Sequence, residues 1–133
     1  MNIIPSSTGA AKAVAKVIPD LEGVFDGVAV RVPVISGSLI DLTMLVERET
    51  SVEEINQLLE NASKDARWQG ILGVTTDPIV SSDILGCEYG SLVSLDLTQV
   101  VAGDMVKVMA WYDNEWSYTS MLGKHVLKVS ELL

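Results

Sequence analysis

The sequence predicts an α+β fold with a mostly antiparallel sheet, helices packed on one face and a C-terminal helix ending the chain. Two kinds of pattern lead to this prediction. In several segments apolar and polar residues alternate, which is typical of half-buried strands, and in others apolar residues recur at helical spacing. The predicted order is helix, two strands, helix, strands and helix. Neighbouring strands in such an order favour antiparallel pairing.

The first predicted helix runs from Ser7 to Ile18, and Pro19 stops it. Small hydroxyl residues and a glycine open this helix, in the stretch SSTGAAKA. The first backbone N–H groups of a helix have no intrahelical acceptor, and the helix dipole favours negative charge there. Ser7, Thr8 and Gly9 could therefore hold a phosphate. An ordinary N-terminal cap is the commoner explanation of these residue types.

Two strands are predicted next, in VFDGVAVRV and LIDLTMLVE, joined by PVISGS with its proline and glycine. We expect them to form a long antiparallel hairpin with one dry face, to which the first strand contributes Val24, Val28, Val30 and Val32. Arg31 lies inside the first strand, and its planar guanidinium suits phosphate. The alternative is an arginine that meets solvent or a carboxylate such as Asp41.

A second helix is predicted from the capping box of Ser51 and Glu54 and from the apolar stripe that follows, Val52, Ile55, Leu58, Leu59 and Ala62. Short strands or turns are expected around Ile71–Val74 and Ile79–Val80. In SLVSLDLTQ we expect one face to carry Val93, Leu95 and Leu97. MVKVMAWY alternates as well and is predicted to be an inner strand.

The final predicted helix has about 18 residues, estimated from its helical spacing, and Asp113 suits its N-terminal cap. The residues that recur at this spacing are Tyr118, Met121, Leu122, His125, Val126, Val129 and Leu132. An apolar helix end of this kind needs something outside the chain to cover it.

Length and composition narrow the function. The 133 residues suit one domain, residues 1–133, and the net charge of -9 argues against nucleic acid as a partner. The single cysteine, Cys87, excludes an intramolecular disulfide and a multi-cysteine metal site, so no metal is expected. No apolar run approaches the roughly 20 residues of a membrane span, and the N-terminus lacks the pattern of a signal peptide. We expect a cytoplasmic protein without membrane contact.

No complete catalytic set is visible in the sequence. Cys87 would need a base to act as a nucleophile, and the only histidine, His125, is expected in mid-helix among apolar residues. We interpret both as structural residues, and no residue is predicted to be catalytic.

The stretch WYDNEWSY, Trp111–Tyr118, holds four aromatic residues of a chain that has only three tryptophans, three tyrosines and one phenylalanine. It is predicted to be a strand end, a cap and a helix start. Asn114 offers both a donor and an acceptor and could bind a carboxamide. The alternative is an aromatic staple that anchors the final helix.

The motifs NIIPSSTGAAKAV, RVPV, GSLIDLT, GILG, VSSDILG and VKVMAWYDNEWSY, in this order, resemble the second half of the catalytic domain in the glyceraldehyde-3-phosphate dehydrogenase family. The resemblance covers essentially the whole chain. It implies that Thr8, Gly9 and Arg31 bind phosphate groups of a sugar-phosphate substrate and of inorganic phosphate. It also implies that Asn114 holds the nicotinamide carboxamide and that Tyr118 lies near the nicotinamide.

The same resemblance implies parts that this sequence does not contain. In the family a nucleophilic cysteine in an S-C-T-T-N motif, a base histidine and a Rossmann domain precede this segment, and Cys87 does not align with that nucleophile. We therefore expect a fragment that is catalytically incompetent alone and belongs to a phosphorylating enzyme. The resemblance implies NAD or NADP in the full-length parent, without tight binding by this chain, and as partners the missing nucleotide-binding domain and further copies in a homo-oligomer. The alternatives are a fragment of erythrose-4-phosphate dehydrogenase, or a non-catalytic module that binds phosphate compounds or self-assembles.

Overall fold

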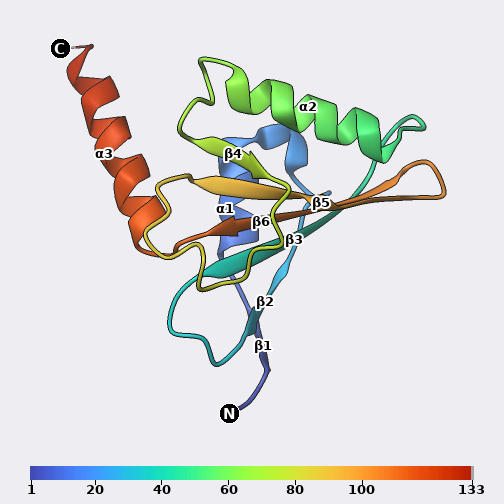
Figure 1. Cartoon of the computed structure of the whole chain (residues 1–133), viewed down its shortest axis with the longest axis horizontal. Helices are drawn as coiled ribbons and strands as arrows, with labels where there is room; N and C mark the ends of the chain where they lie inside the picture. The colour runs from blue at the N-terminus through green and yellow to red at the C-terminus, as the bar shows by residue number, and fades with distance from the viewer. Residues whose placement is uncertain (133) are drawn as a thin grey trace. The chain divides into compact units, whose positions relative to one another are not determined.

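The computed structural model of the chain describes residues 1–132. Its helices and its two β-sheets make an α+β fold, which confirms the predicted class (Figure 1). The backbone divides into two compact units, Met1–Ile35 and Ser36–Leu133. The sequence predicts one domain, and this division of the backbone into two units does not test that prediction. Among the described helices, none has the length and apolar character needed to cross a membrane.

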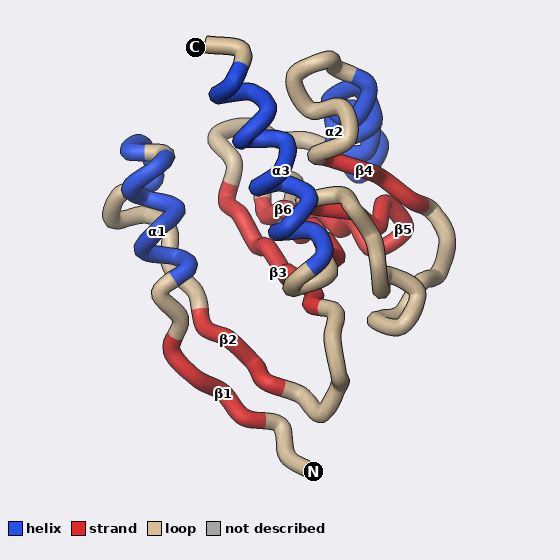
Figure 2. Tube along the Cα trace, turned by 90° about the vertical axis from the view of Figure 1, so that its left-hand side faces the viewer, coloured by secondary structure: helices blue, strands red, loops and turns tan. Residues whose placement is uncertain are grey.

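The first unit consists of a two-stranded ribbon and a helix. Strands β1 (Ile4–Ser7) and β2 (Val28–Arg31) pair antiparallel, and Figure 2 shows them running side by side. Helix α1 spans Ala10–Val17 and is followed by the 3-10 helix η1, Pro19–Leu21. Proline lacks the N–H that would continue α1, and the helix ends at Val17, one residue before the predicted end at Ile18.

The predicted hairpin between VFDGVAVRV and LIDLTMLVE is wrong. Strand β2 pairs with β1, so Val28 faces Ser7 across the ribbon, while β3 (Ser38–Leu45) pairs with β6 (Met105–Tyr112). The expected dry face is also wrong, because the Val28 side chain is 76% exposed. Alternation marks the two faces of a strand but does not specify its partner strand. The strand β1 takes residues Ile4–Ser7, which is why α1 begins later than Ser7.

The second unit is built on a four-stranded sheet in the order β3-β6-β5-β4, where β5 is Ser91–Val101 and β4 is Leu72–Thr75. The pairs β3/β6 and β5/β6 are antiparallel and β4/β5 is parallel, so the sheet is mostly antiparallel as predicted. Helix α2 (Val52–Lys64) packs on β4 and β5 (Figure 1). The buried core consists of Val93, Leu95, Val106, Val108 and Ala110.

Helix α2 begins where its capping box predicts, but only one of the two hydrogen bonds of a capping box is formed. The Ser51 hydroxyl accepts a hydrogen bond from the backbone N–H of Glu54 at 3.2 Å. The Glu54 carboxylate does not return this contact. It binds the Arg48 guanidinium and the Thr50 hydroxyl, the latter at 2.8 Å. The Glu54 side chain therefore connects the first turn of α2 to Arg48 and Thr50, in the segment that follows β3.

A register shift between Ser94 and Gln99 interrupts the pairing of β5 with β6. Within this interrupted stretch the two faces of β5 exchange places: Leu97 is 36% exposed, whereas Thr98 is only 6% exposed. The predicted inward direction of Leu97 is therefore wrong. In the shifted segment residues 95–98 of β5 lie opposite the single residue 108 of β6, and such an odd excess of residues in one strand reverses a period-two pattern.

Helix α3 spans Trp116–Ser130, 15 residues, which is shorter than the predicted helix. One side of α3 contacts loops of the second unit: the Lys124 ammonium donates to the Gly70 carbonyl, and a Cβ at Gly90 would lie 3.2 Å from the Met121 sulfur. The expected uncovered apolar surface is present, because Leu122, Val126, Leu127 and Val129 are all exposed. Of the strand or turn expected at Ile79–Val80, the structure has no strand there, and this segment belongs to the loop between β4 and β5.

Candidate functional site

The predicted phosphate-binding residues Thr8 and Gly9 lie between β1 and α1. The Thr8 hydroxyl accepts a hydrogen bond from the Ala10 N–H at 3.1 Å, and the Gly9 carbonyl accepts the first helical bond, from Ala13. The φ angle of Gly9 is -79°, which other residues adopt easily, so the backbone conformation does not require a glycine. A Cβ at Gly9 would meet nothing within 4 Å. The glycine leaves the helix start uncovered, and such a start suits an anion.

Arg31 lies at the other end of the ribbon from Thr8. It faces Ile4, whereas Val28 faces Ser7, so the two ends are about 10 Å apart at the usual rise of roughly 3.4 Å per residue. Arg31 is exposed, and among residues 1–132 no ion pair includes it. Asp41, the carboxylate considered as its partner, pairs with Lys107 of the second unit at 2.5 Å.

The second part of the candidate site is the corner where β6 leads into α3. Asp113 is buried there, and its Oδ1 atom accepts hydrogen bonds from the N–H groups of Trp116, at 2.8 Å, and Glu115, at 3.0 Å. These bonds satisfy N–H groups of the turn that leads into α3, as the side chain predicted to cap the helix should, although the cap position of α3 itself is Glu115. Its Oδ2 atom accepts a third bond, at 3.0 Å, from the N–H of Gly86 in the loop before β5.

The three N–H donors favour the ionised form of Asp113. Bonds from Trp116 and Gly86, with a smaller contribution from Glu115, hold the pKa of this carboxyl below its usual value, against an opposing effect of burial. The corner therefore carries a fixed negative charge at neutral pH, directly beside Asn114.

Asn114 uses both ends of its side-chain amide. Its Oδ1 accepts a hydrogen bond from the Gly37 N–H at 2.9 Å, and its Nδ2 donates to the Ser38 hydroxyl at 2.6 Å. Asn114 is exposed, and these two contacts leave one N–H hydrogen and one lone pair for a ligand. A carboxamide needs one acceptor and one donor, so the remaining groups fit it. Ser36 donates to the Glu115 carboxylate at 3.1 Å and adds a further contact beside this one.

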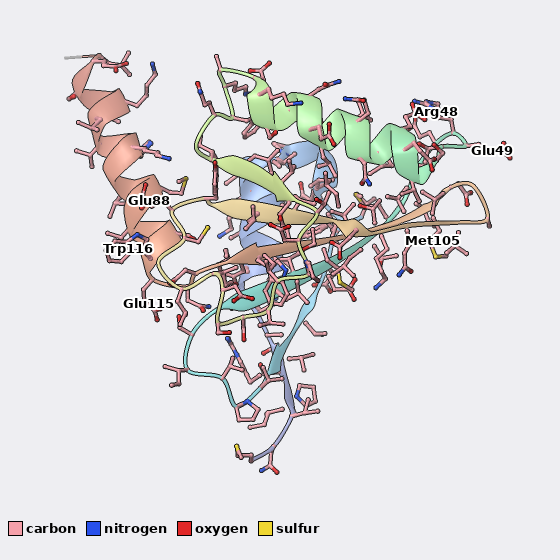
Figure 3. All side chains as sticks on the ribbon, in the orientation of Figure 1. Arg48, Glu49, Glu88, Met105, Glu115 and Trp116 are labelled. Atoms are coloured by element: carbon pink, nitrogen blue, oxygen red, sulfur yellow. The ribbon has the colours of Figure 1, made fainter. Side chains whose placement is uncertain are left out.

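The four aromatic residues of WYDNEWSY divide into two pairs. Trp111 and Tyr112 are half-buried at the end of β6, and the Trp111 indole N–H donates to the Ser94 hydroxyl at 3.0 Å. Trp116 and Tyr118 are 54% and 66% exposed on the first turn of α3. Figure 3 labels Trp116 with Glu115 and Glu88 at this end of the helix. An exposed pair does not act as a staple within the second unit, so Tyr118 is free to line a ligand site.

Residues 1–114 match the family described as glyceraldehyde 3-phosphate dehydrogenase, C-terminal domain. The whole chain is 49% identical to glyceraldehyde-3-phosphate dehydrogenase 2 of Nostoc sp. and 49% identical to the protein of that name in Trichormus variabilis. It is 51% identical over 124 residues, 91% of its length, to glyceraldehyde-3-phosphate dehydrogenase of Streptococcus pyogenes.

The chain belongs to the glyceraldehyde-3-phosphate dehydrogenase family. It spans 38% of the length of the Nostoc and Trichormus proteins and 35% of the Streptococcus protein. Membership confirms the resemblance found from the motifs. The binding roles of Thr8, Gly9, Arg31, Asn114 and Tyr118 remain predictions, because neither sequence identity nor backbone geometry measures binding.

Cys87 and His125 are the residues of this chain whose types would suit a nucleophile and its base. Cys87 is half-buried, and its backbone carbonyl accepts a hydrogen bond from the Ser117 hydroxyl at 3.0 Å. His125 is exposed on α3, not packed among apolar side chains as expected. Within residues 1–132, no group of three or more His, Cys, Asp or Glu side chains could hold a metal ion.

The sequence motifs do not indicate several residues that the structure adds to the candidate site. Gly37 and Ser38 hold the Asn114 amide, and Gly86 and Ser117 contact Asp113. Gly37 has a φ of 92° and forms part of the turn that the proline and glycine of PVISGS indicate. The turn was visible in the sequence, but its contact with a residue 77 positions later was not.

Proposed function

We propose that this chain supplies the phosphate-binding groups and part of the nicotinamide pocket of a phosphorylating glyceraldehyde-3-phosphate dehydrogenase. The observation that carries the proposal is the match of residues 1–114 to the C-terminal domain of that family. The reaction is the NAD- or NADP-dependent oxidation of an aldehyde phosphate to an acyl phosphate, a step of glycolysis. When bound, the dinucleotide accepts the hydride.

Thr8, Gly9 and Arg31 bind the phosphates of the substrate and of inorganic phosphate in this proposal. The open helix start at Gly9 and the exposed guanidinium of Arg31 support it, because both present donors to an anion. The net charge of -9 makes such local donors necessary, since the charge of the whole chain repels an anion.

Asn114 and Tyr118 contribute to the nicotinamide pocket. The free N–H and lone pair of Asn114 bind the carboxamide, while Gly37 and Ser38 hold the rest of the amide in place. Tyr118 offers an exposed aromatic ring one helical turn further along.

The isolated 133-residue chain is proposed to be catalytically incompetent. Attack on the aldehyde needs a thiolate, and Cys87 is not assigned to that task. The family's nucleophile, base and dinucleotide fold come from a nucleotide-binding domain and neighbouring segments, and the working protein is a cytoplasmic homo-oligomer of complete subunits.

An NMR titration tests the phosphate site. Inorganic phosphate added to the ¹⁵N-labelled chain should shift the backbone amide signals of Gly9 and Ala10. Arg31→Met should weaken any phosphate-induced shift at the Arg31 end of the ribbon, whereas Arg67→Met, which removes an exposed arginine of the second unit, should leave the titration unchanged. Equal effects of the two variants would contradict the site, because net charge alone would then explain the binding.

An assay tests the missing catalysis. The purified chain receives glyceraldehyde 3-phosphate, phosphate and NAD, and NADH formation is followed by absorbance beside a Cys87→Ser variant. We expect no NADH from either protein. NADH formation that Cys87→Ser abolishes would assign the nucleophile to Cys87 and contradict the proposal.

A further inference from the structure

We propose that Ser117 is a positioning residue for Asn114. It acts through a closed ring of hydrogen bonds that joins the β6–α3 corner to the loop before β5. The inference deepens the proposed function and rests on it in one respect, the assignment of Asn114 to the nicotinamide pocket.

The ring is formed by four residues. The Asp113 carboxylate accepts a hydrogen bond from the Gly86 N–H at 3.0 Å. The next residue, Cys87, accepts one at its carbonyl from the Ser117 hydroxyl at 3.0 Å. The same hydroxyl oxygen accepts a bond from the Asp113 N–H at 3.1 Å, which closes the ring. The Ser117 hydroxyl therefore acts as a donor and as an acceptor at the same time.

Asn114 lies between the residues that this ring fixes. On one side the Asp113 backbone is held by Ser117, and on the other the Glu115 N–H donates to the Asp113 side chain at 3.0 Å. A side-chain bond across one residue in this way fixes the backbone turn at that residue. The Asn114 side chain then reaches Gly37 and Ser38, so its direction depends on the turn.

Burial makes the Ser117 hydroxyl costly to remove. Ser117 is 2% exposed and Asp113 is 6% exposed, so water has little access to their polar groups. Without the hydroxyl, the Asp113 N–H and the Cys87 carbonyl lose their hydrogen-bond partner. A movement of the backbone that gives them new partners then lowers the free energy. Such a movement changes the turn that carries Asn114.

The expected change is local. Helix α3 keeps its contacts through Met121 and Lys124, and the core residues Val106 and Val108 take no part in the ring. A role in general stability would lower protection throughout the sheet. A positioning role instead affects two bonds in which Ser117 is not a partner, from Gly86 to Asp113 and from Gly37 to Asn114.

Hydrogen exchange followed by NMR separates the two roles. In Ser117→Ala we expect the Gly86 and Gly37 amides to exchange about tenfold faster, the order of effect of one lost hydrogen bond. The Asn114 side-chain amide signals should move, and Val106 and Val108 should keep their exchange rates. Ser130→Ala is the matched control, since the Ser130 hydroxyl bonds only to Leu127 of its own helix. Ser117→Thr, which retains the hydroxyl, should restore slow exchange at Gly86.

Either of two results would overturn the inference: unchanged Gly86 and Gly37 exchange in a folded Ser117→Ala, or unfolding of the whole second unit in that variant. Nicotinamide itself, titrated into the wild type and Ser117→Ala, tests the underlying assignment separately. If nicotinamide shifts the Asn114 signals in the wild type and shifts them less in the variant, both the positioning role of Ser117 and the assignment of Asn114 to the nicotinamide pocket are supported. If the variant disturbs Asn114 but the wild type shows no shift with nicotinamide, the positioning role stands and the pocket assignment fails.

Discussion

The Asp113 carboxylate accepts three backbone hydrogen bonds, from Trp116, Gly86 and Glu115, at the point where β6 ends. The Trp116 and Glu115 donors belong to the start of α3, and the Gly86 donor belongs to the loop before β5. An ionised carboxylate accepts such bonds more strongly than a protonated one. At the scale of single residues, the charge of Asp113 therefore governs the geometry around Asn114.

Protonation of Asp113 at low pH should weaken the hydrogen bonds of this corner. The hydrogen bonds hold the pKa of Asp113 below its usual value of about 3.9, so their contribution to stability is fully present above about pH 4 and is lost as the pH falls through the lower, folded-state pKa. Asp113→Asn should lower the free energy of unfolding at pH 6, and the difference from wild type should shrink as the pH falls below about 4. Urea unfolding across this range measures it.

Glu54 does not interfere with the comparison. Bonds from Arg48 and then from Thr50 lower the pKa of Glu54 to about 2, but this group titrates in both proteins, and its contribution cancels. A difference that stays constant down to pH 2 would mean that the charge of Asp113 is not what matters.

At the scale of elements, the register shift in β5 places a polar side chain in the core. Thr98 is buried on the sheet face that the alternation assigned to Leu97, and among residues 1–132 its hydroxyl oxygen has no hydrogen-bond partner. A buried hydroxyl without a partner is unfavourable.

Thr98→Val should stabilise the chain by about 1 kcal/mol, because a methyl group of similar size replaces the unpaired hydroxyl. Thr43→Val, an exposed position on the edge strand β3, is the control and should change the free energy of unfolding by less than about 0.5 kcal/mol. Both are measured by urea denaturation. A loss of stability in Thr98→Val would indicate that the hydroxyl has a partner in solution, such as a buried water.

Elements also differ in how far the sequence predicts them. Helix α2 was predicted because its cap, Ser51, and its apolar stripe lie within one short segment. The pairing of β2 was not, because its partner β1 contains Pro5 and two serines and carries no alternating pattern. Pairing depends on segments far apart in the chain, which local patterns do not compare.

At the scale of the whole molecule, both units expose apolar residues beyond isolated side chains. The first exposes Val28 and Val30, and the second exposes Leu122, Val126 and Leu127 on α3. Contiguous apolar surface of this kind favours association with another surface.

The purified chain should therefore self-associate with increasing concentration, against the repulsion of its net charge of -9. Val126→Lys should shift the equilibrium towards monomer in sedimentation velocity. Thr119→Lys makes the same change of charge at an exposed polar position of α3 and should have a smaller effect. Equal effects would assign the shift to charge alone.

The sequence by itself determined the α+β class, the helix α2, the strand β6, the cap at Asp113 and the family, because caps, periodicity and motifs are written in neighbouring residues. The tertiary structure decided the pairing of β1 with β2, the reversal of Leu97 and Thr98, and the contacts of Asn114 with Gly37 and Ser38. Those features join residues far apart in the chain or depend on the register shift between β5 and β6. Only the packed fold brings such groups to hydrogen-bonding distance.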